Sequence, residues 1–317
     1  MNMSYFKKLF ILLIIFSGAS KIAGSEEIPY LLNAAGKGDL ETTQAIIESG
    51  GDPNTVDKDN VSALMYAARK NQFAIAKYLI SKGANVNDTE NDGWTALMYA
   101  AKKNHIKVIK ILLTNNANSK ITDPDGWSAY GLAATSGHHE TIELLVKDGI
   151  NPNNRNASGT TILMLACKSG DVATIEILIK NGASTIMKDK FGRTALIYAV
   201  RSNRLNAVDF LLKNGAQIDD EDKYEWTALM WAVNNNKYKI TEILIENNAD
   251  VNHKDNEGTP LIHYAVENNS QKIIRLLIEN KVNLKAKDQY GLTALVYSLK
   301  NKNKEIVDML KAGGGGY

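Results

Sequence analysis

Apolar residues recur along this chain of 317 residues in a pattern that repeats every 33 positions, from near residue 28 to residue 311. A column of hydroxyl residues and one proline marks the repeat and runs through Ser62, Thr95, Ser128, Thr161, Thr194, Thr227, Pro260 and Thr293. No insertion or deletion interrupts the period. Such a strict period predicts a solenoid, in which each unit packs on its neighbours, rather than a globular domain around a buried catalytic centre.

The repeat that begins at residue 189 shows the elements expected of every unit. Residues 189–192 have the composition of a turn, and Thr194 is a good N-cap for the short amphipathic helix that follows. Asn203 then predicts a tight interhelical turn, and a second apolar helix ends at Gly215. Gly or Asn fills the Gly215 column in the other repeats except at Lys281, which should cost about 1 kcal/mol if it is held left-handed.

The start of the first helix resembles the motif of the ankyrin repeat family. The family pattern Asp-x-x-Gly-x-Thr-Pro-Leu-His-x-Ala occurs here mostly as Asp-x-x-Gly-x-Thr-Ala-Leu-Met-Tyr-Ala. Gly-Ala-Asn-Val-Asn at 83–87 and Asn-Ala-Asp-Val-Asn at 248–252 match the family's segment after the second helix. The resemblance implies an all-α repeat solenoid over residues 25–312, built of helix-turn-helix units with projecting turns or short β-hairpins. Nine repeats, numbered here in chain order, would start near residues 25, 57, 90, 123, 156, 189, 222, 255 and 288, followed by a flexible Gly-rich tail at 313–317.

The chain departs from the family pattern in two ways. In the family a His ties neighbouring repeats by hydrogen bonds, whereas this column is mostly Met or another apolar residue here, with a His only at His263. Apolar packing is therefore expected to replace the polar tie. In the fourth repeat Tyr130 replaces Leu, and Gly131 lies inside a short helix at a cost of about 1 kcal/mol, which predicts local softening.

The N-terminal residues form a segment of a different kind. Lys7 and Lys8 precede eight consecutive apolar residues and then a stretch of small residues, a pattern typical of a secretory signal peptide. We predict a signal peptide over residues 1–24, cleaved after Ser20 or Gly24, and export to the periplasm or the exterior. A membrane-spanning helix needs about 20 apolar residues, so no integral span is expected after cleavage. An uncleaved N-terminal helix that anchors the protein is the alternative.

Net charge gives no support for nucleic-acid binding. The chain has 37 basic and 35 acidic residues, but the predicted signal peptide carries three Lys and no acid, which leaves 34 basic residues against 35 acidic ones. A nucleic-acid-binding surface normally needs a strongly basic face. The single cysteine, Cys167, excludes an intramolecular disulfide and falls at a small apolar helix position, so we expect a buried, unreactive thiol.

The sequence contains few candidates for chemistry. His138 and His139 are adjacent at a helix start and point in different directions, and no second ligand pair has a suitable spacing, so no metal site is expected. No phosphate-binding loop, nucleophile elbow or Cys–His pair occurs. The sequence therefore predicts no catalytic residue and no cofactor, and a protein that is not an enzyme.

Candidates for binding are more numerous. In ankyrin-like stacks the turn tips and the exposed side of the first helix line a concave surface on which partners dock. Aromatic residues and Arg dominate many interfaces, although a tip aromatic that only packs on its neighbour is an equal alternative. The candidate contact residues, at turn tips or near the ends of first helices, are Arg69, Trp94, Lys102, Trp127, Phe191, Arg193, Arg201, Tyr224, Trp226 and Tyr290. A further column, Tyr66, Tyr99, Tyr198, Tyr264 and Tyr297, is expected mainly to pack between repeats.

These features predict an exported, monomeric scaffold that binds another protein through its concave face. Basic side chains gather in the N-terminal half of that face, which favours a partner with an acidic segment; a simply solvated face is the alternative. A chaperone-like protector or structural spacer for an exported enzyme is a second hypothesis. A secreted effector that acts in a host cell is a third. The fold by itself does not decide among them.

Overall fold

The computed structural model describes residues 29–316. The predicted signal peptide at 1–24, like its alternative as an anchor, lies outside the described residues. Within residues 29–316 there are eighteen α-helices, and the β pairing consists of five isolated antiparallel bridges. None of these helices is long and apolar enough to cross a membrane. The expected all-α repeat solenoid is confirmed, with single bridges in the projecting turns instead of hairpins.

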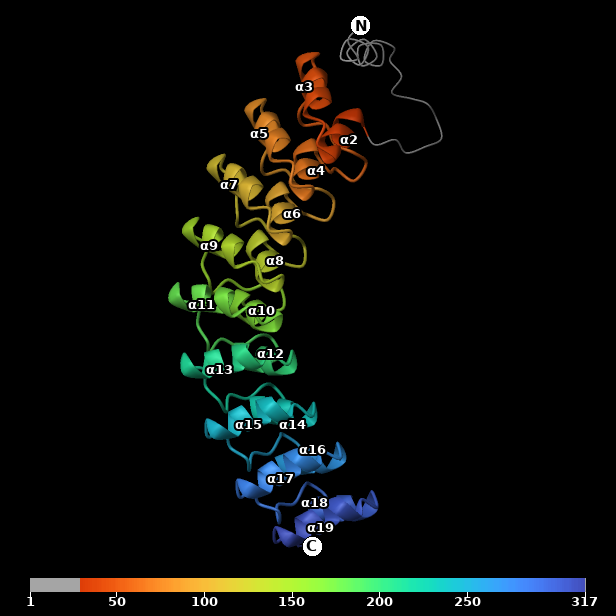
Figure 1. Ribbon diagram of the computed structural model, residues 1–317, viewed down its shortest axis with the longest axis vertical. Coiled ribbons are helices and arrows are strands. Elements are labelled where there is room, and N and C mark those ends of the chain that lie inside the picture. The colour runs from red at the N-terminus through yellow and green to blue at the C-terminus, as the bar shows by residue number, and fades with distance from the viewer. Residues whose placement is uncertain (1–28, 317) are drawn as a thin grey trace. The chain divides into compact units, whose positions relative to one another are not determined.

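The described chain forms two compact arrays, one ending at Ile150 and the other starting at Asn151. The helices of the N-terminal array are α2 (Tyr30–Lys37), α3 (Leu40–Glu48), α4 (Ala63–Arg69), α5 (Phe73–Ser81), α6 (Ala96–Lys102), α7 (Ile106–Thr114), α8 (Ala129–Thr135) and α9 (His139–Lys147). Those of the C-terminal array are α10 (Ile162–Ser169), α11 (Val172–Lys180), α12 (Ala195–Arg201), α13 (Leu205–Lys213), α14 (Ala228–Asn234), α15 (Tyr238–Glu246), α16 (Leu261–Glu267), α17 (Gln271–Glu279), α18 (Ala294–Lys300) and α19 (Lys304–Ala312). Each repeat contributes two of them, one after the other (Figure 1).

In the second to seventh repeats the predicted hydroxyl residue is the N-cap of the first helix, directly before its first helical residue. In each case the side-chain oxygen of that Ser or Thr accepts a hydrogen bond from the backbone N–H three residues further on. At Thr194 the donor is the N–H of Ile197, at 3.4 Å. A cap of this kind stabilises a helix by about 1 kcal/mol. The hydroxyl column therefore marks where these helices start.

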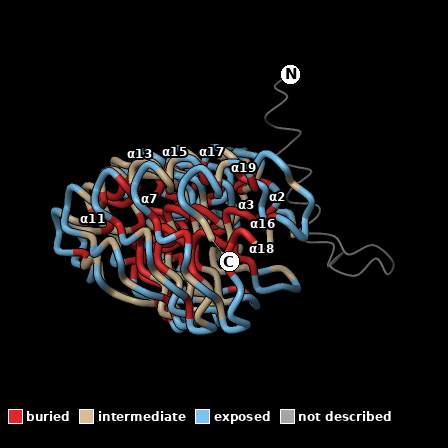
Figure 2. Tube along the Cα trace, turned by 90° about the horizontal axis from the view of Figure 1, so that it is seen from below, coloured by how far each residue is buried: buried red, intermediate tan, exposed pale blue. Residues whose placement is uncertain are grey.

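The helices of each array lie in two layers. In the N-terminal array α4 packs against α2 and α6, and α6 against α8, while α3, α5, α7 and α9 pack in the same order in the other layer. The core lies between the layers, where Leu64 and Leu97 of the first helices and Leu79 and Leu112 of the second are at most 1% exposed. In Figure 2 the buried residues lie toward the middle of the trace and most exposed residues lie at its periphery. Each such Leu contributes about 1.5–3 kcal/mol by burial.

The tight turns adopt the left-handed backbone that Gly and Asn favour. In the sixth repeat Asn203 has a φ of 57° between the two helices, and Gly215 has a φ of 83° after the second. Lys281, the expected exception, is left-handed as well, with a φ of 61°. The turn geometry of the repeat thus overrides the preference of the residue, at a cost of about 1–2 kcal/mol.

Side-chain amides link successive repeats beyond the second helix. The amide of Asn54 donates to the carbonyl of Gly83 at 3.3 Å and accepts from the N–H of Asn85 at 2.8 Å. Asn87 and Asn153 make the same two bonds to the repeats that follow them. Ile186 occupies this column with its side chain 57% exposed and has no amide with which to form the link.

The Gly-rich segment lies against the last repeat. The N–H groups of Gly313, Gly314 and Gly315 donate to carbonyls of α19, and the hydroxyl of Thr293 donates to the carbonyl of Gly316 at 2.8 Å. Residues 313–316 therefore close the end of the C-terminal array. The flexibility expected of 313–317 stays a prediction.

Candidate protein-binding surface

A hydrogen bond between residues nine positions apart fixes the turn tips of five repeats. In each, an oxygen of a turn Asp accepts from an aromatic side chain of the first helix, and we call this pair the tip clamp. The five pairs are Asp57–Tyr66 at 2.9 Å, Asp189–Tyr198 at 2.8 Å, Asp222–Trp231 at 3.0 Å, Asp255–Tyr264, and Asp288–Tyr297 at 2.5 Å. From the sequence these tyrosines were predicted mainly to pack between repeats, and their hydrogen bond to the turn Asp was missed. The recurrent nine-residue spacing of Asp and an aromatic residue was the signal.

In the tip clamp of the last repeat, the hydrogen bond favours the ionised form of Asp288 and the neutral form of Tyr297. The hydrogen bond to Asp288, together with burial, raises the pKa of Tyr297 to about 12. Burial alone would raise the pKa of Asp288. The hydrogen bonds from the Tyr297 hydroxyl and from the N–H groups of Leu292 and Tyr290 outweigh it, so the pKa of this carboxyl lies below its ordinary value.

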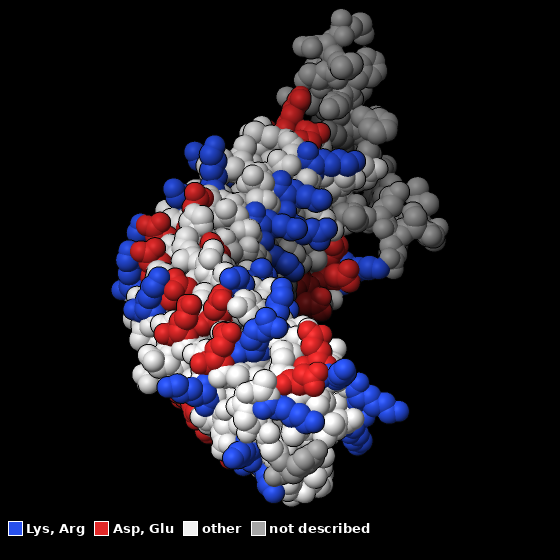
Figure 3. Space-filling view, turned by 60° about the horizontal axis from the view of Figure 1, so that its bottom comes forward, with Lys and Arg blue, Asp and Glu red and all other residues white. Residues whose placement is uncertain are grey.

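Two adjacent hollows open on the tip face of the N-terminal array, meaning its turn tips and the outer side of its first helices. The first, the basic hollow, has a volume of about 530 Å³. It is lined by Arg69, Lys70, Glu90, Asp92, Trp94, Tyr99, Lys102 and Lys103. Four cationic side chains therefore line it against two carboxylates. Figure 3 shows basic side chains gathered in the upper part of the face in view.

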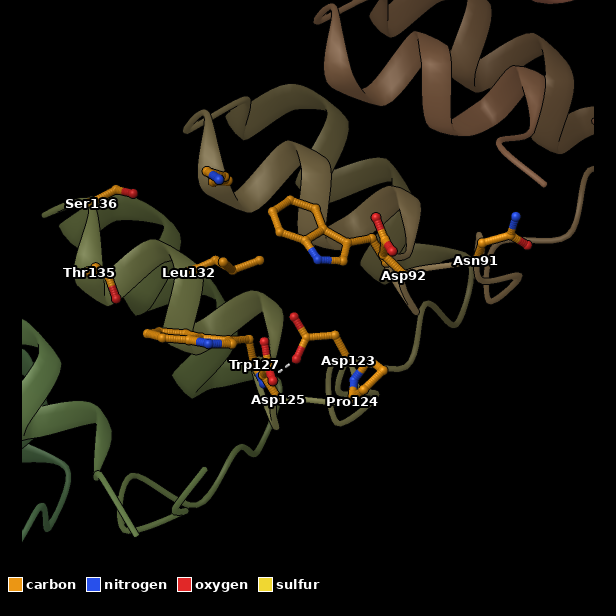
Figure 4. Close-up of a pocket in the computed structure, with 11 residues that line it drawn as sticks. Asn91, Asp92, Asp123, Pro124, Asp125, Trp127, Leu132, Thr135 and Ser136 are labelled. Atoms are coloured by element: carbon orange, nitrogen blue, oxygen red, sulfur yellow. Dashed lines mark hydrogen bonds between the residues drawn. The ribbon is translucent and has the colours of Figure 1, made fainter. Parts of the chain in front are cut away.

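The second hollow, the tryptophan hollow, has a volume of about 620 Å³. It is lined by Asn91, Asp92, Trp94, Lys102, Asp123, Pro124, Asp125, Trp127, Leu132, Thr135 and Ser136. Figure 4 shows Leu132, Trp127 and the Asp123 carboxylate around one space, with Asp123 Oδ1 accepting the backbone N–H of Trp127 at 2.7 Å. Because the two hollows share Asp92, Trp94 and Lys102, one partner segment can reach both.

Contacts within the chain orient Trp94 at the boundary of the two hollows. Its ring centroid lies 5.1 Å from that of Tyr99, and the Nζ atom of Lys102 lies 4.8 Å from the Trp94 centroid. The guanidinium of Arg69 lies 6.0 Å from the ring of Tyr99. The structure thus brings four predicted contact residues, Arg69, Trp94, Lys102 and Trp127, to the two hollows of one array.

In the C-terminal array the predicted Arg193 is engaged by the chain itself. Its guanidinium binds Asp189 through Nε at 2.8 Å and Nη2 at 2.7 Å, and it lies 4.6 Å from the ring of Phe191. The Arg193 side chain is 20% exposed and that of Asp189 is fully buried. The positive charge of Arg193 is therefore already paired with the carboxylate of Asp189 in the same turn.

The other predicted residues of this array differ widely in exposure. Trp226 is half-buried, with ring centroids 4.9 Å from Trp231 and 4.8 Å from Tyr264 of the next repeat, and Arg201 lies 4.3 Å from the Trp231 ring. By contrast, the exposed aromatic residues here are Phe191 at 43%, Tyr224 at 50% and Tyr290 at 73%. Trp226 therefore mainly packs on neighbouring rings, whereas Phe191, Tyr224 and Tyr290 leave more of their surface accessible to a partner.

The titratable side chains outside the two hollows were also candidates for chemistry. Within 29–316 no group of three or more His, Cys, Asp or Glu side chains is placed to hold a metal ion. His138 donates from Nε2 to the carbonyl of Lys102 at 3.1 Å, which links two repeats. Burial raises the pKa of the Cys167 thiol, which is 0% exposed, and so opposes formation of the thiolate.

Comparison with known proteins assigns the fold to a family. A family model described as ankyrin repeats (3 copies) matches residues 31–123, 112–189, 175–255 and 229–315. The crystal structure of the human ASB11 ankyrin repeat domain is similar with a TM-score of 0.65 and 26% identity, over 71% of this chain and 99% of that one. The ankyrin repeat domain of Bcl-3, a member of the IkappaB protein family, is similar with a TM-score of 0.62 and 24% identity, over 69% of this chain and 99% of that one.

The Bcl-3 likeness shows the fold alone at that identity. No curated protein matches the sequence. The family match covers nearly all of the described residues, and it agrees with the paired helices, the hydroxyl caps and the left-handed turns. The chain belongs to the ankyrin repeat family.

Proposed function

We propose that this protein is a non-enzymatic scaffold that binds another protein on the tip face of its N-terminal array. The observation that carries the proposal is the pair of adjoining hollows that share Trp94 and Lys102. Aromatic rings beside charged groups in a recess are the usual anchors of a protein interface. Ankyrin repeat domains typically act as scaffolds for protein–protein interaction, and this array supplies a defined place for it.

The basic hollow favours an acidic segment of the partner. Arg69, Lys70, Lys102 and Lys103 outnumber the carboxylates of the same hollow, and all four side chains are exposed. Cation–π contacts to Tyr99 and Trp94 hold the side chains of Arg69 and Lys102 in place. Because the side chains of Arg69 and Lys102 are already positioned before binding, they lose little conformational entropy when a partner binds.

Export and a monomeric state belong to the same proposal. Export rests on the pattern of residues 1–24, which favours delivery to the periplasm or the exterior. A soluble scaffold for a protein partner also agrees with the near-neutral charge left after removal of that segment, which gives no attraction to nucleic acid.

The test is affinity capture with residues 25–317 as bait, followed by measurement of Kd with the captured protein. Replacing Trp94 and Trp127 together by Ala should weaken binding at least about tenfold, because two ring anchors are lost. The melting temperature should change little, since both rings lie at turn tips. Tyr290→Ala is the matched control, because this ring is exposed and lies outside both hollows.

A charge variant separates the two hollows. Lys70→Glu with Lys103→Glu should also weaken binding and should flatten its dependence on salt, because both ammonium groups line only the basic hollow. Unchanged affinity in both double variants would refute the proposed surface. Capture of no protein by any bait would favour the spacer role instead.

A further inference from the structure

We propose that the tryptophan hollow receives a basic side chain, Arg or Lys, from the bound partner. This inference rests on the proposed function, because it needs a partner segment that lies across the tip face. It adds a second requirement to the partner, which would present a cation beside its acidic residues. Four features of the fourth repeat carry the inference.

The first feature is a tip clamp that has lost its donor but kept its acid. Asp123 stands in the column of the clamp acids, and its Oδ1 accepts the N–H of Trp127 as in the other repeats. The residue nine positions on is Leu132, so the aromatic donor is missing. Within residues 29–316 the Oδ2 atom of Asp123 receives no hydrogen bond, although the equivalent oxygen is bonded in five other repeats.

The fifth repeat shows that the loss of the aromatic residue does not require an unpaired acid. There Leu165 replaces the aromatic residue and Asn156 replaces the acid at the same time. Asn156 Oδ1 still accepts the N–H groups of Ser158 and Thr160 at 3.0 Å, so a neutral amide serves the turn equally well. The turn alone therefore does not explain the negative charge at Asp123.

The second feature is the space itself. Leu132 lines the tryptophan hollow at the position where a Tyr or Trp ring would otherwise extend toward the turn acid. The hollow of about 620 Å³ thus opens beside the carboxylate that lacks its donor. A partner group that enters it can supply the missing hydrogen bond.

The third feature is an aromatic ring without a cation. In this array the guanidinium of Arg69 lies near Tyr99, and the ammonium of Lys102 lies over Trp94. Thr135 occupies the same column in the fourth repeat and lines the hollow. Among residues 29–316 no cationic side chain lies over the Trp127 ring, so this face is open to a cation from outside.

The fourth feature is the charge of the lining. Carboxylates of Asp92, Asp123 and Asp125 face the single ammonium of Lys102, which the Trp94 ring already engages. Asp92 and Asp125 stand in the tip column that carries Phe191, Tyr224 and Tyr290 in the C-terminal array. The tryptophan hollow is therefore net negative, whereas the adjoining basic hollow is net positive.

The sixth repeat contains an internal template for the proposed complex. Asp189, the counterpart of Asp123, binds the guanidinium of Arg193, which also lies against the ring of Phe191. A partner Arg in the tryptophan hollow would make the same two contacts, with the Asp123 carboxylate and the Trp127 ring. The chain thus already uses this carboxylate column to bind a guanidinium beside an aromatic ring.

The test uses residues 25–317 and synthetic peptides that carry a pair of Glu residues and a single Arg at graded spacings. Each is compared with the same peptide in which citrulline, the neutral isostere, replaces Arg. Fluorescence polarisation of labelled peptides should show that the wild type prefers one Arg spacing over its citrulline twin by about tenfold, the expected effect of a paired cation on an aromatic ring.

Two variants and a control locate this preference. Leu132→Tyr fills the hollow and restores the donor to Asp123, and Asp123→Asn removes the charge while keeping the acceptor for the Trp127 N–H. Both variants should abolish the preference for Arg over citrulline. The melting temperature of Leu132→Tyr should equal or exceed that of the wild type, because the variant regains the hydrogen bond of the tip clamp. Leu165→Tyr, in the repeat without an acid, should leave the preference intact.

Two results would overturn the inference. One is a wild type that binds Arg and citrulline peptides equally at every spacing. The other is an Arg preference that survives both Leu132→Tyr and Asp123→Asn. Loss of partner capture in the Trp94 and Trp127 variant, together with either result, would leave the proposed function standing and remove only the cation site.

Discussion

His263 is the only histidine in a column that otherwise holds mostly Met or another apolar residue. Its Nε2 donates to the carbonyl of Leu292 in the next repeat at 3.1 Å, and its Nδ1 is buried without a hydrogen-bond partner among the described residues. Burial lowers the pKa of this imidazole below 6.5 more strongly than the bond to Leu292 raises it. The polar tie of the family thus survives at one place, on a ring whose burial favours the neutral form.

Replacing His263 by Met, the residue of four other repeats, should flatten the stability of the protein against pH. The unfolded chain protonates this His near pH 6.5, whereas the folded chain resists protonation until a lower pH, so the wild type loses stability as pH falls from 6.5 toward the folded-state pKa. Urea unfolding at pH 7.5 and pH 5.5 measures the difference.

Between pH 7.5 and pH 5.5 the free energy of unfolding should fall less in His263→Met than in the wild type. An equal loss in both proteins would show that other groups carry it. His263→Gln, which keeps a hydrogen-bond donor but does not titrate in this range, separates the tie from the charge.

Among the elements, the turns beyond the second helices are linked by side-chain amides in the column of Asn54, and we call these links the amide ladder. Lys120 and Ile186 stand in this column without an amide. Asn at the equivalent position bonds to one carbonyl and one N–H of the next repeat, as Asn54 and Asn153 do. The exposed Ile side chain leaves these two amide hydrogen bonds unmade, and the nearest polar link between the fifth and sixth repeats is that of Lys188 to Asp220 and to the carbonyl of Glu221.

The variant Ile186→Asn should raise the free energy of unfolding by about 1 kcal/mol, the usual gain from hydrogen bonds of this kind. Thermal and urea unfolding measure the change. Ile186→Ala is the control, because it removes the exposed side chain without adding an amide. A rise of the same size in both variants would attribute the gain to loss of the exposed apolar group rather than to the ladder.

Most of the helices and turns could be predicted from the sequence because their causes are local. The caps at Thr194 and its counterparts, and the left-handed turns at Asn203 and Gly215, depend on residue type and on a fixed offset within the repeat. Even the left-handed backbone of Lys281 could be predicted, because Lys281 occupies the position that Gly215 has in the sixth repeat.

The candidate surface was predictable only in part. Arg69, Trp94, Lys102 and Trp127 were selected from their columns, and the structure places them at the two hollows. The tip clamp and the hollow beside Leu132 were not foreseen, because both depend on where side chains of the turn and of the first helix meet. For the same reason the sequence did not show that Asp189 engages Arg193.

Across the whole chain, the fourth repeat combines several unfavourable features. Gly131 lies inside α8, and the buried hydroxyl of Tyr130 has no hydrogen-bond partner among the described residues. Leu132 leaves a tip clamp without its donor. Since a repeat array is stabilised by its units and by their neighbour contacts, a weak unit lowers local stability without ending the fold.

Hydrogen exchange should therefore be faster in α8 than in α6 or α12, its counterparts in the third and sixth repeats. Mass spectrometry of deuterated protein at neutral pH measures this difference. Tyr130→Phe should slow the exchange of α8, because it removes a buried unsatisfied hydroxyl that costs about 1–3 kcal/mol. Equal protection of the three helices would contradict the expected local softening.

The replacement of His by Met in the column between repeats also changes which chemical stress the stack resists. The side chains of Met65, Met98, Met164 and Met230 are at most 1% exposed and carry no proton that titrates, so mild acid leaves these contacts alone. A thioether is instead open to oxidation, and its sulfoxide is polar and poorly suited to a packed core. Each local opening of a repeat therefore exposes a Met side chain to oxidation by a peroxide. Reduction of the methionine sulfoxide is the reaction that restores the packed contact.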